Sequence, residues 1–198
     1  MNIDAKLVKD LRDRTGAGMM NCRKALQESG GDIDKAVDWL RKQGIAKAAK
    51  RSSRAASEGT VSSYVHLGGK IGVIVEVNCE TDFVARTEEF QELGHELAMQ
   101  IAATAPLAVS RDELSKELVE KERTLYLEQA KESGKPEKIW DRIAEGKLEK
   151  YYKDNCLMEQ NSIRDSDRTV DEMVKELAGK LGENIVVRRF ARFQVGEE

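Results

Sequence analysis

Residues 60–78 read TVSSYVHLGGKIGVIVEVN, and this stretch decides the fold. Apolar and polar residues alternate on both sides of Gly68-Gly69, which is the period of a β-strand with one buried face. A Gly-Gly pair between two such runs is typical of a tight hairpin turn, because glycine accepts the positive φ angles of that turn. The second strand carries an apolar face made of Ile71, Val73, Val75 and Val77. Val61, Val65 and Leu67 of the first strand can pair with these residues on the same face of the sheet.

Helical spacing of apolar residues follows the hairpin. From Phe90 to Ile101 they recur at three- and four-residue intervals, and Pro106 ends the pattern. Residues 110–154 alternate charge signs and predict two longer helices, with a capping box from Ser110 to Glu113 and Pro136 opening the second helix. A further helix begins after Thr169. The closing NIVVRRFARFQV predicts a third strand, since a two-stranded hairpin alone is marginal in water.

Residues 1–44 predict three short helices, with Asp32 placed to cap the third and Gly44 to follow it. The segment RKQGIAKAAKRSSR (41–54) then holds six basic residues and no acidic one. A solvated helical or flexible spacer and a basic contact to an acidic partner or RNA both remain open for it. The sequence thus predicts an α+β protein with a three-helix module at 1–44, a basic linker at 45–58, and a core domain at 59–198. In that core a three-stranded antiparallel sheet packs with helices.

Composition narrows the class of protein. The net charge of −3 gives no overall nucleic-acid footprint, and three widely spaced cysteines argue against a disulfide framework. No apolar run is long enough for a membrane span, and the N-terminus lacks the features of a secretory signal. We therefore expect a cytoplasmic protein without a membrane partner.

Motifs for catalysis and cofactors are absent from the sequence. Neither GGKIG nor TGAGMM has the residues or the strand-to-helix context of a phosphate loop, so we expect no direct nucleotide binding. His66 and His95 lack the companions that a metal site needs. Cys79 has apolar neighbours and no adjacent base, which favours a core thiol over a nucleophile. We expect no catalytic residues, no metal and no cofactor.

Two local features favour a binding protein. Met19-Met20 starts a helix, and adjacent methionines cannot both face the core of a small bundle. Thr81-Asp82-Phe83-Val84 lies between a strand and a helix. One interpretation makes Asp82 a helix cap with Phe83 folded inward, and the other exposes Phe83 for a partner.

Three stretches resemble the bacterial elongation factor Ts family closely: LVKDLRDRTGAGMMNCRKAL, GGDIDKAVDWLRKQGIAKAAK and GGKIGVIVEVNCETDFVA. The segments SGKPEKIWDRIAEGKLEKYY, NCLMEQ and RFQVGE are also similar to that family. The resemblance covers essentially the whole chain and implies a UBA-like N-terminal bundle. Longer members carry two related core halves and a coiled-coil hairpin, whereas this chain passes directly from the TDFV helix to segments like the second half. It resembles a short form with one core copy.

This resemblance implies a guanine nucleotide exchange factor for elongation factor Tu. By position it assigns Asp82 and Phe83 to insertion between helices of the GTPase, and Arg12, Met19 and Met20 to contacts of the N-terminal module. It implies that Thr81 and Val84 shape the turn. A single core copy also favours a homodimer, since a second chain could supply the missing surface.

Two other classes of function stay open at the level of sequence. One is an RNA- or ribosome-associated adapter that uses the helical module and the basic linker, which a steep salt dependence of RNA binding would support. The other is a small enzyme that uses Cys79, which an unreactive thiol would dismiss.

Overall fold

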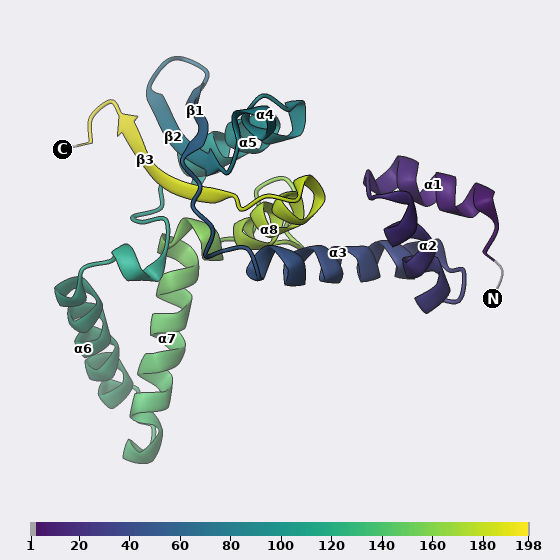
Figure 1. The fold of residues 1–198 in the computed structure, drawn as a ribbon. Helices are drawn as coiled ribbons and strands as arrows, with labels where there is room; N and C mark the ends of the chain where they lie inside the picture. The colour runs from purple at the N-terminus through teal and green to yellow at the C-terminus, as the bar shows by residue number, and fades with distance from the viewer. Residues whose placement is uncertain (1–2, 198) are drawn as a thin grey trace. The chain divides into compact units, whose positions relative to one another are not determined.

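The computed structural model describes residues 3–197, so that residues 1, 2 and 198, at the ends of the expected domains, lie outside it. The chain is an α+β protein, as predicted (Figure 1). It divides into two compact units. The first contains residues up to Gly59, Asn78–Phe90 and Glu172–Val186, and the second contains Thr60–Val77, Gln91–Asp171 and the residues from Val187 onward.

Three helices open the first unit: α1 (Ala5–Thr15), α2 (Met19–Glu28) and α3 (Ile33–Ala49). The Asp32 side chain caps α3 by accepting from the backbone N–H of Lys35 at 3.1 Å, as predicted. Gly16 ends α1 at a φ of 64°, a left-handed conformation that glycine adopts without strain. The helices enclose one apolar cluster, formed by Val8, Leu11, Cys22, Ala25, Leu26 and Ala36.

The prediction that the third helix ends near Gly44 is wrong, because α3 continues to Ala49. Gly44 lies where α3 crosses α8 (Val170–Leu181), and the glycine that faces it there is Gly179. A Cβ atom on Gly179 would lie 2.6 Å from the Cα of Gly44, so the close approach requires glycine at position 179, whereas a Cβ atom on Gly44 would lie 3.9 Å from the Cα of Gly179. Arg41 adds ion pairs with Glu172 at 3.4 Å and Glu176 at 3.8 Å. The glycine therefore marks a helix crossing instead of a helix end.

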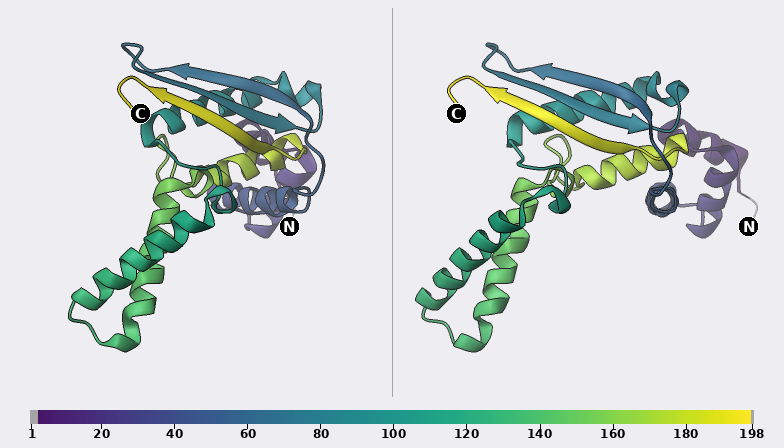
Figure 2. Two further views of the ribbon diagram at one scale, coloured as in Figure 1. Left: turned by 90° about the vertical axis from the view of Figure 1, so that its left-hand side faces the viewer. Right: turned by 60° about the vertical axis from the view of Figure 1, so that its left-hand side comes forward.

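The sheet has the order β1-β2-β3, with strands β1 (Glu58–Val65), β2 (Ile71–Cys79) and β3 (Val186–Gln194), and Figure 2 shows them side by side. Gly68 and Gly69 have φ angles of 87° and 67°, as the predicted hairpin turn requires. The predicted apolar face of β2 is also confirmed, since Val73, Val75 and Val77 are buried.

The expectation for β1 is wrong, because Val61, Val65 and Leu67 are exposed. The inward face of β1 carries Ser62 and Tyr64 instead. Helix α5 (Glu88–Thr104) comes so close that a Cβ atom on Gly94 would lie 2.2 Å from the Ser62 Oγ. The Tyr64 ring packs edge-on against His95 with 5.8 Å between ring centroids. A small residue must face inward at this approach, so the valines face outward.

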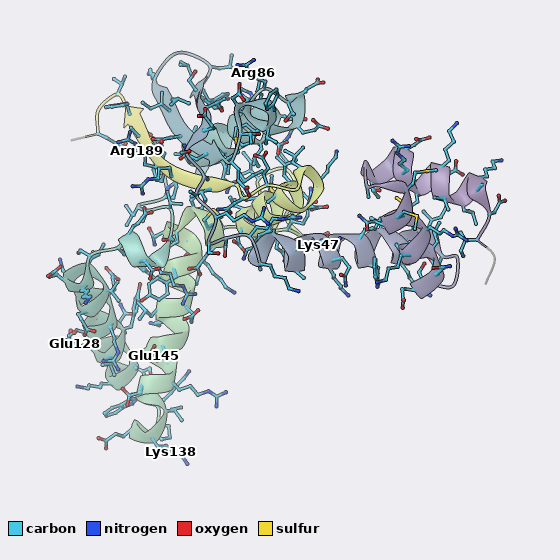
Figure 3. All side chains as sticks on the ribbon, viewed as in Figure 1. Lys47, Arg86, Glu128, Lys138, Glu145 and Arg189 are labelled. Carbon is cyan, nitrogen blue, oxygen red and sulfur yellow. The ribbon has the colours of Figure 1, made fainter. Side chains whose placement is uncertain are left out.

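Two helices of the second unit, α6 (Lys116–Glu132) and α7 (Trp140–Asn155), form a helical hairpin (Figures 1 and 2). The two longer helices predicted for residues 110–154 are thereby confirmed. Arg123 of α6 pairs with Glu145 at 3.0 Å, and Figure 3 shows Glu145 on the side of α7 that faces α6. Short 3-10 turns flank the hairpin at Arg111–Glu113, Glu137–Ile139 and Leu157–Glu159.

The predicted caps of this hairpin need correction. Ser115, not Ser110, caps α6, and its hydroxyl accepts from the Leu118 N–H at 3.2 Å. Pro136 precedes a 3-10 turn, and α7 itself begins at Trp140. Among the helices of residues 3–197, none combines the length and the apolar character of a bilayer span.

Candidate partner-binding site

The TDFV junction is a one-turn helix at the end of the central strand. Strand β2 ends at Cys79, and α4 spans Asp82–Ala85. The cap of α4 is Thr81, whose hydroxyl accepts from the Val84 N–H at 3.4 Å. The interpretation of Asp82 as the cap is therefore wrong. Asp82 is the first helical residue, and its carboxylate lies 2.8 Å from Arg86.

Phe83 is 80% exposed, which contradicts the interpretation that folds it inward. Ala85 is buried and Val84 partly buried, so these two residues attach the turn to the protein. Successive residues of a helix are about 100° apart around its axis, which places Phe83 away from Ala85. The chain thus presents an aromatic ring to solvent on a capped turn.

Glu183, in the loop after α8, holds this turn by its side chain. One of its carboxylate oxygens accepts from the backbone N–H groups of Glu80 and Thr81 at 3.0 Å each. The other accepts from the Thr81 hydroxyl at 2.6 Å. Glu183 is about 100 residues away in the chain, and no periodicity or motif indicates that it reaches Thr81.

The second predicted contact region lies where α1 meets α2. Arg12, in the last turn of α1, is exposed, and Met19 and Met20 at the start of α2 are 54% and 76% exposed. Cys22 fills the bundle interior below them, with its thiol donating to the Ala17 carbonyl at 3.4 Å. Both methionines are therefore available on the surface.

Lys180 of α8 contacts a residue near each of these two regions, Gly16 near the methionines and Glu89 near the TDFV turn. Its side chain packs against Gly16, where a Cβ atom would lie 2.5 Å from the lysine Cε. Its amine pairs with Glu89 of α5 at 3.5 Å. The turn that precedes Met19 and the helix that follows the TDFV turn thus contact one lysine of the first unit.

Comparison with known proteins identifies the family. A family model described as "Elongation factor TS" matches residues 41–197, and one described as "Elongation factor Ts, mitochondrial, N-terminal" matches residues 1–48. Elongation factor Ts of Thermosipho melanesiensis is 59% identical over 195 residues, which are 98% of this chain and 100% of the relative. The proteins of that name from Syntrophus aciditrophicus and Caldanaerobacter subterraneus are 53% and 56% identical, over 100% and 98% of this chain and 98% of each relative.

The chain belongs to the elongation factor Ts family. Elongation factor Ts is the nucleotide exchange factor for elongation factor Tu in translation elongation, and it is not an enzyme. It is a bacterial cytoplasmic factor. The resemblance seen in the sequence is confirmed over the full length of the chain.

The alternative of a cysteine enzyme fits poorly with an elongation factor Ts fold and with the geometry. Cys79 is fully buried, and its thiol donates to the Thr81 carbonyl at 3.1 Å. Burial raises the pKa of this thiol, and the negative charge of Glu183 raises it further. A thiol that stays protonated is a poor nucleophile. Within residues 3–197, no group of three His, Cys, Asp or Glu side chains is arranged to hold a metal ion.

The basic segment of this elongation factor Ts chain forms ion pairs within the protein. Arg41 pairs with α8, and Arg54 lies 3.5 Å from the Glu80 carboxylate. Two of the six basic residues are therefore paired within the protein instead of being presented to an acidic partner or RNA.

Proposed function

We propose that Phe83 is the residue by which this exchange factor anchors itself in elongation factor Tu. Asp82 accompanies it, while Thr81 and Val84 hold the turn. The observation that carries the proposal is an aromatic side chain 80% exposed on a turn whose backbone is fixed by a cap and by Glu183. An exposed aromatic residue on a rigid support is typical of a binding hot spot.

Burial of the Phe83 ring supplies the energy of this contact. A phenylalanine buries roughly 150 to 250 Å² in a partner groove, which corresponds to about 4 to 6 kcal/mol as an upper bound. Ordering a mobile side chain costs about 0.5 to 1.5 kcal/mol, and a fixed backbone reduces that cost. Most of the burial energy is then left for binding. Asp82 can exchange its exposed ion pair with Arg86 for a polar group of the partner, because such a surface pair contributes at most about 1 kcal/mol.

Nucleotide release follows from linkage. The factor must bind nucleotide-free elongation factor Tu more tightly than the nucleotide-bound form, and the nucleotide loses the same amount of affinity in return. A difference of about 5.5 kcal/mol moves a two-state partner from 1:99 to 99:1. No bond is made or broken in this process.

We further propose that the chain acts through three parts. Residues 1–44 form a second contact, with Arg12, Met19 and Met20 on its surface. Residues 45–58 connect it to the core domain at 59–198. The exposed methionines support this assignment, because flexible thioether side chains adapt to a partner surface.

The affinity for nucleotide-free elongation factor Tu tests the proposed site. Phe83→Ala is expected to weaken binding at least about tenfold and Met20→Ala about threefold. Leu107→Ala is the matched control, since Leu107 is also exposed and lies in the second unit. Wild-type affinity of both Phe83→Ala and Met20→Ala in isothermal titration calorimetry would contradict the proposal.

We also propose that the active form is a homodimer joined through the outer face of the sheet. That face carries exposed apolar residues on all three strands and at their ends, namely Val61, Val65, Ile74, Phe193 and Val195. Exposed apolar side chains on a soluble protein favour association, and closed two-fold pairs are the commonest oligomers. The single core copy supports the same arrangement, because a second chain would add a second sheet.

A further inference from the structure

The loop after α8 is built to reach the TDFV turn. Gly182 ends α8 with its N–H donating to the Ala178 carbonyl at 3.0 Å and with a φ of 81°. This left-handed conformation turns the chain sharply, and it favours glycine. The next two residues, Glu183 and Asn184, then lie beside the end of β2.

Glu183 satisfies both backbone N–H groups that follow the end of the strand. Its carboxylate accepts from Glu80 and Thr81, and also from the Thr81 hydroxyl. Hydrogen bonds to an ionised acceptor are shorter and stronger than neutral ones. Three such bonds from one side chain fix the backbone at 80–81 and the rotamer of the residue that caps α4.

Asn184 extends the network to the segment before β1. Its backbone N–H donates to the Glu80 carboxylate at 2.7 Å, and its buried side chain donates to the carbonyls of Ser52 and Arg54 at 3.3 and 2.8 Å. Arg54 in turn pairs with Glu80. Two residues of one loop therefore connect α8, the strand end and the linker.

We infer that Glu183 is a positioning residue for the exchange reaction, which sets the orientation of Phe83 without contacting the partner. The inference rests on the proposed role of Phe83. Glu183 bonds to the backbone two and three residues before Phe83, while the ring itself stays exposed. The network thus fixes the support of the ring and leaves the ring free to bind. Loss of this support lowers binding because the turn must then be ordered in the complex.

A double-mutant cycle on the full chain tests this coupling. Release of fluorescent GDP from elongation factor Tu is followed by stopped flow, with each variant below saturation. Glu183→Ala is expected to slow release about fivefold in the wild-type background and by less than about twofold in the Phe83→Ala background. A residue that acted only through general stability would give the same factor in both backgrounds, and that result would overturn the inference.

Conservative variants supply the rescue. Glu183→Gln is expected to retain activity within about twofold of wild type, because the oxygen of the side-chain amide can accept from both backbone N–H groups and its NH2 group can donate to the Thr81 hydroxyl. Glu132→Ala, an exposed glutamate at the end of α6, is the matched control and should match wild type. If Glu183→Ala does not fold, Glu183→Asp is used, which keeps the charge, shortens the reach and should slow release about threefold.

The outcomes separate the two proposals. A Phe83→Ala protein with wild-type release contradicts the proposed site, and with it the basis for the coupling. A Phe83→Ala protein that is defective, together with a folded Glu183→Ala protein within about twofold of wild type, overturns the role of Glu183 alone.

Discussion

Phe83 and Cys79 lie four residues apart and have opposite environments. Cys79 is the last residue of β2 and is fully buried, whereas Phe83 is exposed. Hydrophobicity alone would predict the reverse for Phe83. The cap at Thr81 explains the difference, because it starts α4 at an angle at which Ala85 faces the protein and Phe83 faces solvent.

The thiol of Cys156 gives a residue-scale prediction for alkaline pH. Burial raises its pKa to about 11, from an ordinary value of 9.0. Below pH 9 the thiol is protonated in both the folded and the unfolded state. Between pH 9 and 11 only the unfolded state loses its proton, so the free energy of unfolding should fall by about 2 kcal/mol over this window.

Urea denaturation at several pH values checks this expectation against Cys156→Ala. The variant has no thiol at this position, so its stability should fall less steeply above pH 9, although it starts from a lower value because a core atom is lost. If the free energy of unfolding falls equally steeply with pH in the wild type and in Cys156→Ala, the Cys156 thiol has the same pKa in the folded and the unfolded state, which would contradict the prediction.

At the scale of elements, alanine is expected to change the stability of the protein in opposite directions at two glycines, one at the crossing of α3 and α8 and one in α7. Gly179→Ala should destabilise the protein by about 1 to 3 kcal/mol, because the added Cβ meets the backbone of Gly44. Gly146→Ala, in the middle of α7, should stabilise it by about 0.5 to 1 kcal/mol, since nothing lies within 4 Å of the added atom. Denaturation midpoints of the two variants on the same side of wild type would contradict the packing described for one of the two glycines.

Periodicity predicted most elements and failed where tertiary contacts decide. The three N-terminal helices, the hairpin turn and the apolar face of β2 follow from local patterns. The end of α3 does not follow from local patterns, because Gly44 resembles the glycine that ends a helix, and only the structure shows that it lies against Gly179. Which face of β1 is buried does not follow from local patterns either, since only the close approach of Gly94 explains why Ser62 points inward.

The candidate site shows the same division. The sequence placed Thr81 to Val84 at a strand-to-helix junction, and this is confirmed. The exposure of Phe83 could not be derived from the sequence, because a helix capped by Asp82, with Phe83 in the core, is equally compatible with the sequence of this segment. Glu183 was missed since its partners are about 100 residues away. Their assignment to partner binding stays a prediction.

At the scale of the whole molecule, the proposed dimer can be tested directly. Sedimentation equilibrium at micromolar concentration should give twice the chain mass of 22.2 kDa. Phe193→Arg should raise the dissociation constant at least about tenfold, since it places a charge on an apolar face where Phe193 is 70% exposed. Leu107→Arg, which lies outside the three strands, should leave the dimer intact. A wild-type monomer, alone and with elongation factor Tu, would exclude the homodimer.

The central claim is that Phe83 serves the partner and not the core of this chain. Its most direct test is stopped-flow release of fluorescent GDP from elongation factor Tu by Phe83→Ala, together with the melting temperature of the same preparation. We predict a loss of at least about tenfold in release, equal to ~1.4 kcal/mol or more, and a melting temperature close to wild type. A core phenylalanine would instead cost about 3 to 5 kcal/mol of stability. A variant that melts far earlier yet, while folded, releases GDP at the wild-type rate would contradict the claim.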